Sequence, residues 1–189
     1  MSDAAAGHVA TPGQTIGPFF HYGLEFDGGP DLVPAGRSDA IRLTGIVYDG
    51  AGTPIPDALI EIWQSAPDGS VPRADGSLNR DGRTFTGWGR CPTDRSGRYT
   101  FTTVTPGAVP GSSARWFSVV VFARGLLNRL FTRCYLPDDG LDTDPLLASV
   151  EPDRRASLIA TPDNDGYVFD IHLQGDAETV FLRFPSHLD

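Results

Sequence analysis

Two segments in the first third of the chain alternate apolar and polar residues with a period of two, the pattern of a β-strand with one buried face. They are Arg42–Asp49 (RLTGIVYD) and Ala58–Ser65 (ALIEIWQS). Between them lies the sequence GAGTPIP, where glycine accepts a positive φ and proline cannot donate a backbone hydrogen bond. Because no helix or lysine follows, we interpret this stretch as a turn and not as a phosphate-binding loop.

The rest of the chain follows the same pattern, in which glycine and proline separate short apolar runs. Only one stretch favours helix: Asp144 can cap a first turn at Pro145, and Glu151–Pro152 opens a second helix that continues to Ile159. The pattern predicts an all-β fold, a two-sheet β-sandwich with one or two short helices. Its other predicted strands are Arg98–Val104, Arg115–Ala123, Asn128–Leu136, Tyr167–Gln174 and Glu178–Arg183.

The strand predicted at Arg115–Ala123 is mainly apolar on both faces. A strand with one face in water normally keeps that face polar, so both faces of this strand need cover. Other elements of the same chain can provide the cover, and so can another subunit; the sequence favours neither. The strand ends at Arg124. Its two faces carry Phe117, Val119 and Val121 on one side and Trp116, Ser118, Val120 and Phe122 on the other.

Length and charge limit the range of functions. The 189 residues fit one domain, which we place at 11–189 after a flexible tail of residues 1–10. A net charge of −9, with no lysine, argues against a partner such as nucleic acid or an anionic membrane. The sequence has no signal-peptide pattern and no apolar run long enough to span a membrane, so we expect a cytoplasmic protein.

Few side chains form a pattern typical of catalysis or metal binding. We interpret His172 as a surface residue, whereas His21 fits a loop or a pocket equally well. Cys91 and Cys134 stand alone and are interpreted as reduced thiols in or near the core. None of the four histidines has the spacing of a common metal pair: His8, His21, His172 and His187.

Two further groups have simple structural interpretations. Trp63 ends an alternating strand, so we expect a core aromatic. A turn rich in aspartate lacks the spacing of a calcium loop, so we expect it to be solvated. Its acidic residues are Asp138, Asp139, Asp142 and Asp144.

Arg124 is the residue most suggestive of a site. A guanidinium at the end of an apolar run needs a partner, because burying an unpaired charge is costly. The partner is either a carboxylate of this chain or the carboxylate of a ligand, which arginine binds well in a bidentate manner. The residues alone leave both alternatives open.

Five segments, taken in order, carry a resemblance to a known family. The chain is similar to the intradiol ring-cleaving dioxygenases from about Thr11 to Phe184, which implies a transthyretin-like (prealbumin-like) sandwich. The hairpin GIVYDGAGTPIP alone is weak, because transthyretin-like binding modules share it; the ordered set is specific. The segments are TPGQTIGPFFHYGL, GIVYDGAGTPIPDALIEIWQSAPDG, GWGRCPTDRSGRYTFTTVTPG, VVVFARGLLNRLFTRCYLPDD and FDIHLQGDAETVFLRF.

The resemblance also implies what this chain lacks. Catalytic members of the family bind Fe(III) through two tyrosines and two histidines, and no matching position here offers an equivalent ligand. Valine cannot coordinate, and an indole N–H is only a donor. The chain therefore resembles the non-catalytic α chain of the two-chain members, with the Fe(3+) held by a homologous β chain and no catalytic residue of its own. The four matching positions hold Val71, Val109, Trp116 and Ser118.

In such α chains the QTxGP segment and the FARG arginine line the mouth of the partner's active site. The matching substrate-binding residues here are Thr15, Gly17, Pro18 and Arg124. The implied reaction is cleavage of protocatechuate by O₂ to 3-carboxy-cis,cis-muconate, with Arg124 binding the ring carboxylate.

Two alternatives compete with this interpretation. A self-sufficient catechol-type dioxygenase has an added N-terminal helical segment and all four iron ligands, and this sequence shows neither. A non-enzymatic transthyretin-like binding module shares the hairpin, but predicts no obligate partner chain and no dependence on an aromatic acid.

Overall fold

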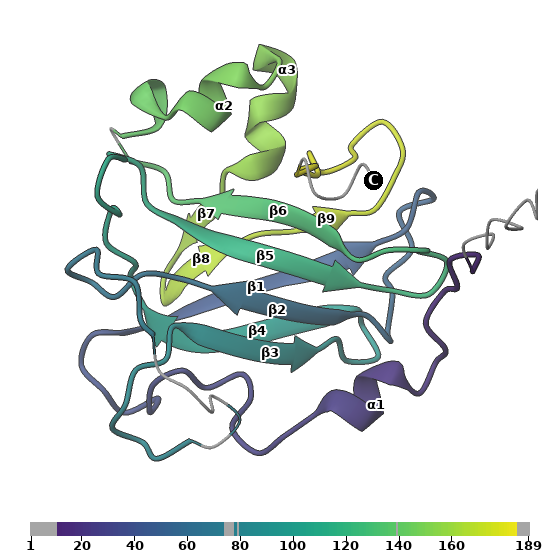
Figure 1. The fold of residues 1–189 in the computed structure, drawn as a ribbon, viewed down its shortest axis with the longest axis horizontal. Helices are drawn as coiled ribbons and strands as arrows, with labels where there is room; N and C mark the ends of the chain where they lie inside the picture. Colours follow the sequence, from purple (N-terminus) through teal and green to yellow (C-terminus); the bar gives the residue numbers. More distant parts are fainter. Residues whose placement is uncertain (1–10, 74–77, 79, 139, 185–189) are drawn as a thin grey trace, which may run out of the picture.

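The chain folds as two β-sheets packed face to face (Figure 1). The computed structural model describes residues 11–73, 78, 80–138 and 140–184. The tail expected at residues 1–10, together with His8, Asp139 and His187, lies outside the described residues. Within them, the predicted two-sheet, all-β sandwich is confirmed.

The first sheet is built on β1 (Ala40–Tyr48), the longest of the described strands. It pairs antiparallel with β4 (Arg98–Val104) and parallel with β8 (Gly166–Val168) and β9 (Ile171–His172). β7 (Thr161–Asp163) completes the sheet beside β8. This sheet lies behind the other in Figure 1.

The second sheet has the order β3-β2-β5-β6, with every neighbouring pair antiparallel. Its strands are β3 (Trp88–Pro92), β2 (Leu59–Trp63), β5 (Trp116–Phe122) and β6 (Leu130–Tyr135). The position of β5 between β2 and β6 fixes both ends of the strand, where the residues of interest lie.

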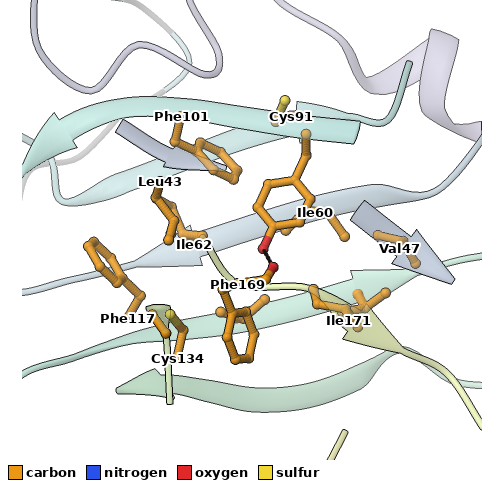
Figure 2. Packing of buried hydrophobic residues seen from close by; sticks show 14 of the residues in the cluster. Leu43, Val47, Ile60, Ile62, Cys91, Phe101, Phe117, Cys134, Phe169 and Ile171 are labelled. Atoms are coloured by element: carbon orange, nitrogen blue, oxygen red, sulfur yellow. Dashed lines mark hydrogen bonds between the residues drawn. The ribbon is translucent and has the colours of Figure 1, made fainter. Parts of the chain in front are cut away.

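The core fills the space between the two sheets. Alternate residues of β5 and the residue just after it, from Phe117 to Ala123, point inward and are almost completely buried. They meet inward residues of the facing sheet such as Leu43, Phe101 and Ile171 (Figure 2). The opposite face of β5 is only partly covered by its own chain, in part through Phe20, whose ring lies 5.4 Å from that of Phe122.

A buried tyrosine ties the C-terminal part of the chain to this core. The hydroxyl of Tyr99 donates a hydrogen bond of 2.5 Å to the carbonyl of Phe169 (Figure 2, dashed line). Burial raises the pKa of Tyr99 well above its ordinary value, so the hydroxyl stays protonated and can donate. Gly45 permits the approach, because a Cβ there would lie 1.9 Å from the Phe169 carbonyl oxygen.

The strand predicted at Tyr167–Gln174 is wrong as a single element, since the structure divides it into β8 and β9. At the break, the side chain of Asp170 accepts the backbone N–H of Ile46, where a regular ladder would use a backbone carbonyl. The strand predicted at Glu178–Arg183 is also wrong. Thr132 and Ser157 hydroxyls bind the backbone of Val180 there, and Leu182 makes only an isolated bridge.

The helical prediction holds in outline. The side chain of Asp144 accepts the N–H of Leu147 and caps α2 (Pro145–Ser149), as expected. α3 (Pro152–Arg155) passes into a 3₁₀ turn, Ala156–Leu158, close to the predicted end. The sequence patterns missed α1 (Phe20–Leu24), together with β3 and β7; each is at most five residues long.

The Tyr99 hydroxyl provides a test of the core. Replacing Tyr99 with Phe leaves the buried Phe169 carbonyl without its donor, and we expect a loss of about 1–3 kcal/mol in the free energy of unfolding. The measurement is urea denaturation followed by circular dichroism. Tyr48→Phe is the control, because Tyr48 is half-buried and stacks on His172; a loss for Tyr99→Phe no larger than the control's would contradict the assignment.

Candidate functional site

A small pocket lies where β5 begins, on the outer face of the second sheet. Its volume is about 140 Å³. All four residues expected at the family's iron-ligand positions line it: Val71, Val109, Trp116 and Ser118. Segments far apart in sequence therefore bring these residues together around one cavity.

The polar groups around this pocket are mostly engaged with the protein itself. The amide nitrogen of Gln64 donates to the carbonyls of Ser65 and Val104, and the hydroxyl of Ser65 donates to the Gly107 carbonyl at 2.6 Å. The guanidinium of Arg133 lies 3.9 Å from the centre of the Trp116 ring. These contacts fix the walls of the pocket and leave it mainly apolar.

The side chains at the four positions do not fit a ferric ion. Two valines offer no lone pair, the indole of Trp116 offers only an N–H, and Ser118 offers a single neutral hydroxyl. Among the described residues, no group of three or more His, Cys, Asp or Glu side chains is arranged to hold a metal.

No helix in the described part is long and apolar enough to cross a membrane.

Trp63 also lines this pocket, which corrects the expectation of a core aromatic. The residue is 48% exposed. It sits on the outer face of β2 at the end of the strand, where little of the chain covers it, and its ring lies 5.9 Å from that of Trp88. The alternating pattern predicts the strand β2 correctly, but it does not indicate which end of that strand reaches the surface.

The opposite end of β5 carries Arg124. Its Nε forms a close ion pair with Oδ2 of Asp57, and no other hydrogen bond or ion pair of Arg124 occurs within the described residues. The Arg124 side chain is 54% exposed, whereas that of Asp57 is only 9% exposed. Of the two partners that the sequence left open, the structure shows the carboxylate of this chain, and the guanidinium still faces solvent.

Asp57 was missed by the sequence patterns, although strand pairing marks it. β2 and β5 are antiparallel, with Leu59 opposite Phe122. Two residues before Leu59 and two residues after Phe122, Asp57 falls opposite Arg124. The signal is visible only once the register of the two strands is known.

The N-terminal segment meets the chain just after Arg124. The hydroxyl of Thr15 accepts the N–H of Gly125 at 2.7 Å, and Gly125 has a φ of +87°, a conformation that favours glycine. A Cβ on Gly13 would lie 3.6 Å from that of Leu127. Figure 1 shows this purple segment running past the end of β5 toward α1.

All four expected substrate-binding residues thus occupy one exposed end of the sheet. Gly17 and Pro18 are exposed and lead into α1, where the N–H of Phe20 hydrogen-bonds to the Gly17 carbonyl. Next to them Phe19 and Tyr22 are 78% and 65% exposed. The segment tied to Gly125 through Thr15 thus presents two exposed aromatic rings, and the neighbouring Arg124 is half-exposed.

The two described histidines differ in position: His21 follows Phe20, which packs on Phe122 at the end of β5, whereas His172 belongs to the other sheet. His21 is buried in α1, and its Nδ1 has no hydrogen-bond partner in the described structure. His172, expected at the surface, is half-buried and stacks on Tyr48 with ring centres 4.8 Å apart. Within the described part of the chain, neither histidine belongs to a group of three or more side chains that could hold a metal ion.

The aspartate-rich turn is less solvated than expected. Asp142 is exposed, but Asp144 is buried, where it caps α2 and accepts a hydrogen bond from the hydroxyl of Tyr135. Asp138 pairs with Arg115 at 2.7 Å. The turn is held by protein contacts, because its carboxylates satisfy neighbouring donors.

Comparisons with known proteins establish the family. The dioxygenase family matches residues 17–175. A protocatechuate 3,4-dioxygenase alpha chain from Burkholderia cepacia is 36% identical over 91% of this chain and 96% of its own. The beta chain of protocatechuate 3,4-dioxygenase from the same organism is 34% identical over 77% of this chain and 68% of its own. The chain therefore belongs to the intradiol ring-cleaving dioxygenases, which are Fe(III)-dependent oxidoreductases.

A solved structure agrees with the fold. The dioxygenase domain of a dioxygenase–carbohydrate-binding protein fusion from Streptomyces sp. SirexAA-E superposes with a TM-score of 0.59. The match covers 87% of this chain and 99% of the solved domain at 23% identity, so the similarity concerns the fold alone.

The two cysteines are interpreted correctly as core thiols, and this gives a test of their chemistry. Burial raises the pKa of Cys91 to about 11 and that of Cys134 well above its ordinary value. The thiolate is the nucleophile, so a rise from 9.0 to about 11 lowers its population at pH 8 by about a hundredfold.

We therefore expect both cysteines to resist iodoacetamide at pH 8 in the folded protein and to react rapidly in urea. Mass spectrometry after timed quenching measures the labelling. Labelling of either thiol in the folded chain at the rate of free cysteine would contradict the buried placement.

Proposed function

We propose that this chain is the α subunit of a protocatechuate 3,4-dioxygenase. In this proposal it assembles with a homologous β chain that holds the Fe(3+), and the complex cleaves the ring of protocatechuate with O₂ to give 3-carboxy-cis,cis-muconate. Both oxygen atoms enter the product, so no further reductant is needed. The alpha and beta chains among the relatives support the pairing of two homologous chains.

The observation that carries the proposal is the separation of two features along β5. Ser118 lies in the pocket that has no iron-binding side chains, six residues before Arg124 in the sequence. At about 3.3 Å per residue, this separates the two residues by about 20 Å. Arg124 therefore cannot act on a molecule held in that pocket of the same chain. An exposed cation at the other end of the strand fits a site that a second chain completes.

Arg124 suits the carboxylate of protocatechuate. Asp57 occupies one of its five N–H donors, at Nε, and the outer donors remain for a ligand. A carboxylate held by a fixed guanidinium also sets the direction in which the two ring hydroxyls point, so the contact orients the substrate as well as binding it.

Thr15, Gly17 and Pro18 complete this chain's share of the proposed site. All three are exposed and lie in the segment that Thr15 ties to Gly125. Their role is to form the wall beside Arg124 and to limit the access of water to the bound carboxylate.

A substitution at Arg124 tests the proposed role. In the assembled enzyme, Arg124→Ala removes a charged hydrogen-bond donor, a loss of about 1.5–3 kcal/mol, and we expect KM for protocatechuate to rise about 10- to 100-fold. Steady-state oxygen uptake with protocatechuate and with unsubstituted catechol measures the effect.

Catechol is the internal control, because it lacks the carboxylate but shares every effect of the substitution on folding and assembly. Arg124→Ala also leaves Asp57 buried without its partner, which lowers stability for both substrates alike. An equal rise in KM for both substrates would count against a carboxylate site.

The residues around the pocket of this chain give a second test. Purified without a partner, the chain should contain no stoichiometric iron and show no tyrosinate-to-iron colour, because Val71, Val109, Trp116 and Ser118 supply no suitable ligands. Metal analysis and visible absorption make the measurement. A red ferric species at one iron per chain would overturn the assignment to the iron-free subunit.

The non-enzymatic binding module is not favoured, because the family match and the two relatives span most of the chain. Affinity purification from the source cells separates the two interpretations. A second homologous chain with protocatechuate-dependent oxygen uptake supports the dioxygenase, whereas a lone chain without uptake would support the module.

A further inference from the structure

We propose that Asp57 is a positioning residue for Arg124, which fixes the direction of the guanidinium and so determines selectivity for carboxylate-bearing catechols. This inference rests on the proposed role of Arg124 in binding the substrate carboxylate. It adds a residue that touches no substrate and acts through the arginine alone.

The first observation is the setting of Asp57. Its side chain is 9% exposed, and Oδ1 has no hydrogen-bond partner within the described residues, although it is fully buried. Among the described residues, the one ion pair or hydrogen bond of Oδ2 is that with Arg124. A buried carboxylate with one partner is costly to maintain, since a single contact compensates only part of its lost hydration. Its single contact with Arg124 is therefore the interaction that offsets this cost.

The second observation is which edge of the guanidinium the carboxylate occupies. The ion pair joins Oδ2 of Asp57 to Nε, on the side of the planar group, and no hydrogen bond from a terminal nitrogen of Arg124 to Asp57 occurs within the described residues. Nε lies nearest the side-chain stem, so a contact there restrains the orientation of the whole plane. The terminal N–H groups point away from the stem and remain able to take a ligand carboxylate.

The third observation is that the backbone on both sides is fixed. Asp57 and Arg124 lie just outside the antiparallel β2–β5 ladder, two residues beyond the Leu59–Phe122 pair that ends it. Beyond Arg124, the Gly125 N–H is held by the hydroxyl of Thr15. The guanidinium and the backbone that follows Arg124 are thus both restrained before a substrate arrives, which lowers the entropy lost on binding.

The negative charge of Asp57 has an opposing effect, since it partly neutralises the attraction of Arg124 for a second carboxylate. Orientation outweighs this repulsion here, because Asp57 lies buried behind the guanidinium while a ligand approaches its exposed side. Removing Asp57 should therefore weaken the binding of protocatechuate and not strengthen it.

The test compares two substitutions in the assembled two-chain enzyme. Asp57→Ala should lower the ratio of kcat/KM for protocatechuate to kcat/KM for catechol by about three- to tenfold, within the coupling range of residues in contact. The loss should appear as a higher KM for protocatechuate, with kcat for catechol unaltered. Asp57→Asn keeps an oxygen that accepts from Nε, so it should show a smaller loss and guards against a failure of Asp57→Ala to fold.

Glu61→Ala is the matched control. Glu61 lies on β2, four residues after Asp57, and its largely buried side chain pairs with Arg90 at 2.6 Å without involving Arg124. We expect this variant to leave the substrate ratio unchanged. If Glu61→Ala lowers the ratio as much as Asp57→Ala, the effect is a general loss of stability and the proposal is wrong.

A double-mutant cycle separates this inference from the proposed function. In an Arg124→Ala background, Asp57→Ala should change the ratio no further, because Asp57 acts only through Arg124. A further loss as large as that in the native background would overturn the inference. If Arg124→Ala alone has no substrate-selective effect, the carboxylate site itself is wrong; if it has one and Asp57→Ala does not, only the role of Asp57 is wrong.

Discussion

The pairing of β5 between β2 and β6 is the constraint on which the rest of the structure depends. A strand presents alternate residues to opposite faces, so one face of β5 builds the core while the other carries Trp116, Ser118 and Arg124. The same regular geometry keeps the two ends of that outer face apart. A pocket with no iron ligands and an exposed arginine therefore belong to two different sites, although one strand supports both.

The arginine end shows how a charge is kept at the edge of apolar surface. Asp57 enters from the neighbouring strand and pairs with Arg124 on its stem side, while Thr15 holds the turn that follows. Neither contact occupies the exposed side of the guanidinium. The pocket end shows the opposite case, where valine and tryptophan line a cavity of about 140 Å³ and the nearby polar groups bind the backbone. Under the proposed function, the Arg124 end of β5 binds a ligand anion, whereas the side chains that line the pocket at the other end do not fit a ferric ion.

Much of the sandwich was predictable from alternation alone, since β1, β2, β4, β5 and β6 all lie within a few residues of their predicted bounds. The failures have physical causes. Around Phe169 and Val180 the backbone hydrogen-bonds to side chains, and no periodic pattern reports which donors will do so. Trp63 looked like a core residue because alternation gives a face but not the end of the sheet that is left uncovered. Arg124 could be singled out from sequence, whereas Asp57 could not, because its importance depends on the register between two strands.

A crystal structure of this chain with its iron-bearing partner and bound protocatechuate, taken under anaerobic conditions, would measure the decisive geometry. We predict that the substrate carboxylate lies within hydrogen-bond distance of the terminal nitrogens of Arg124, that Asp57 stays on Nε, and that the iron is bound by the partner chain. A substrate held without Arg124, or an iron bound near Val109 and Trp116 of this chain, would contradict the division of roles along β5.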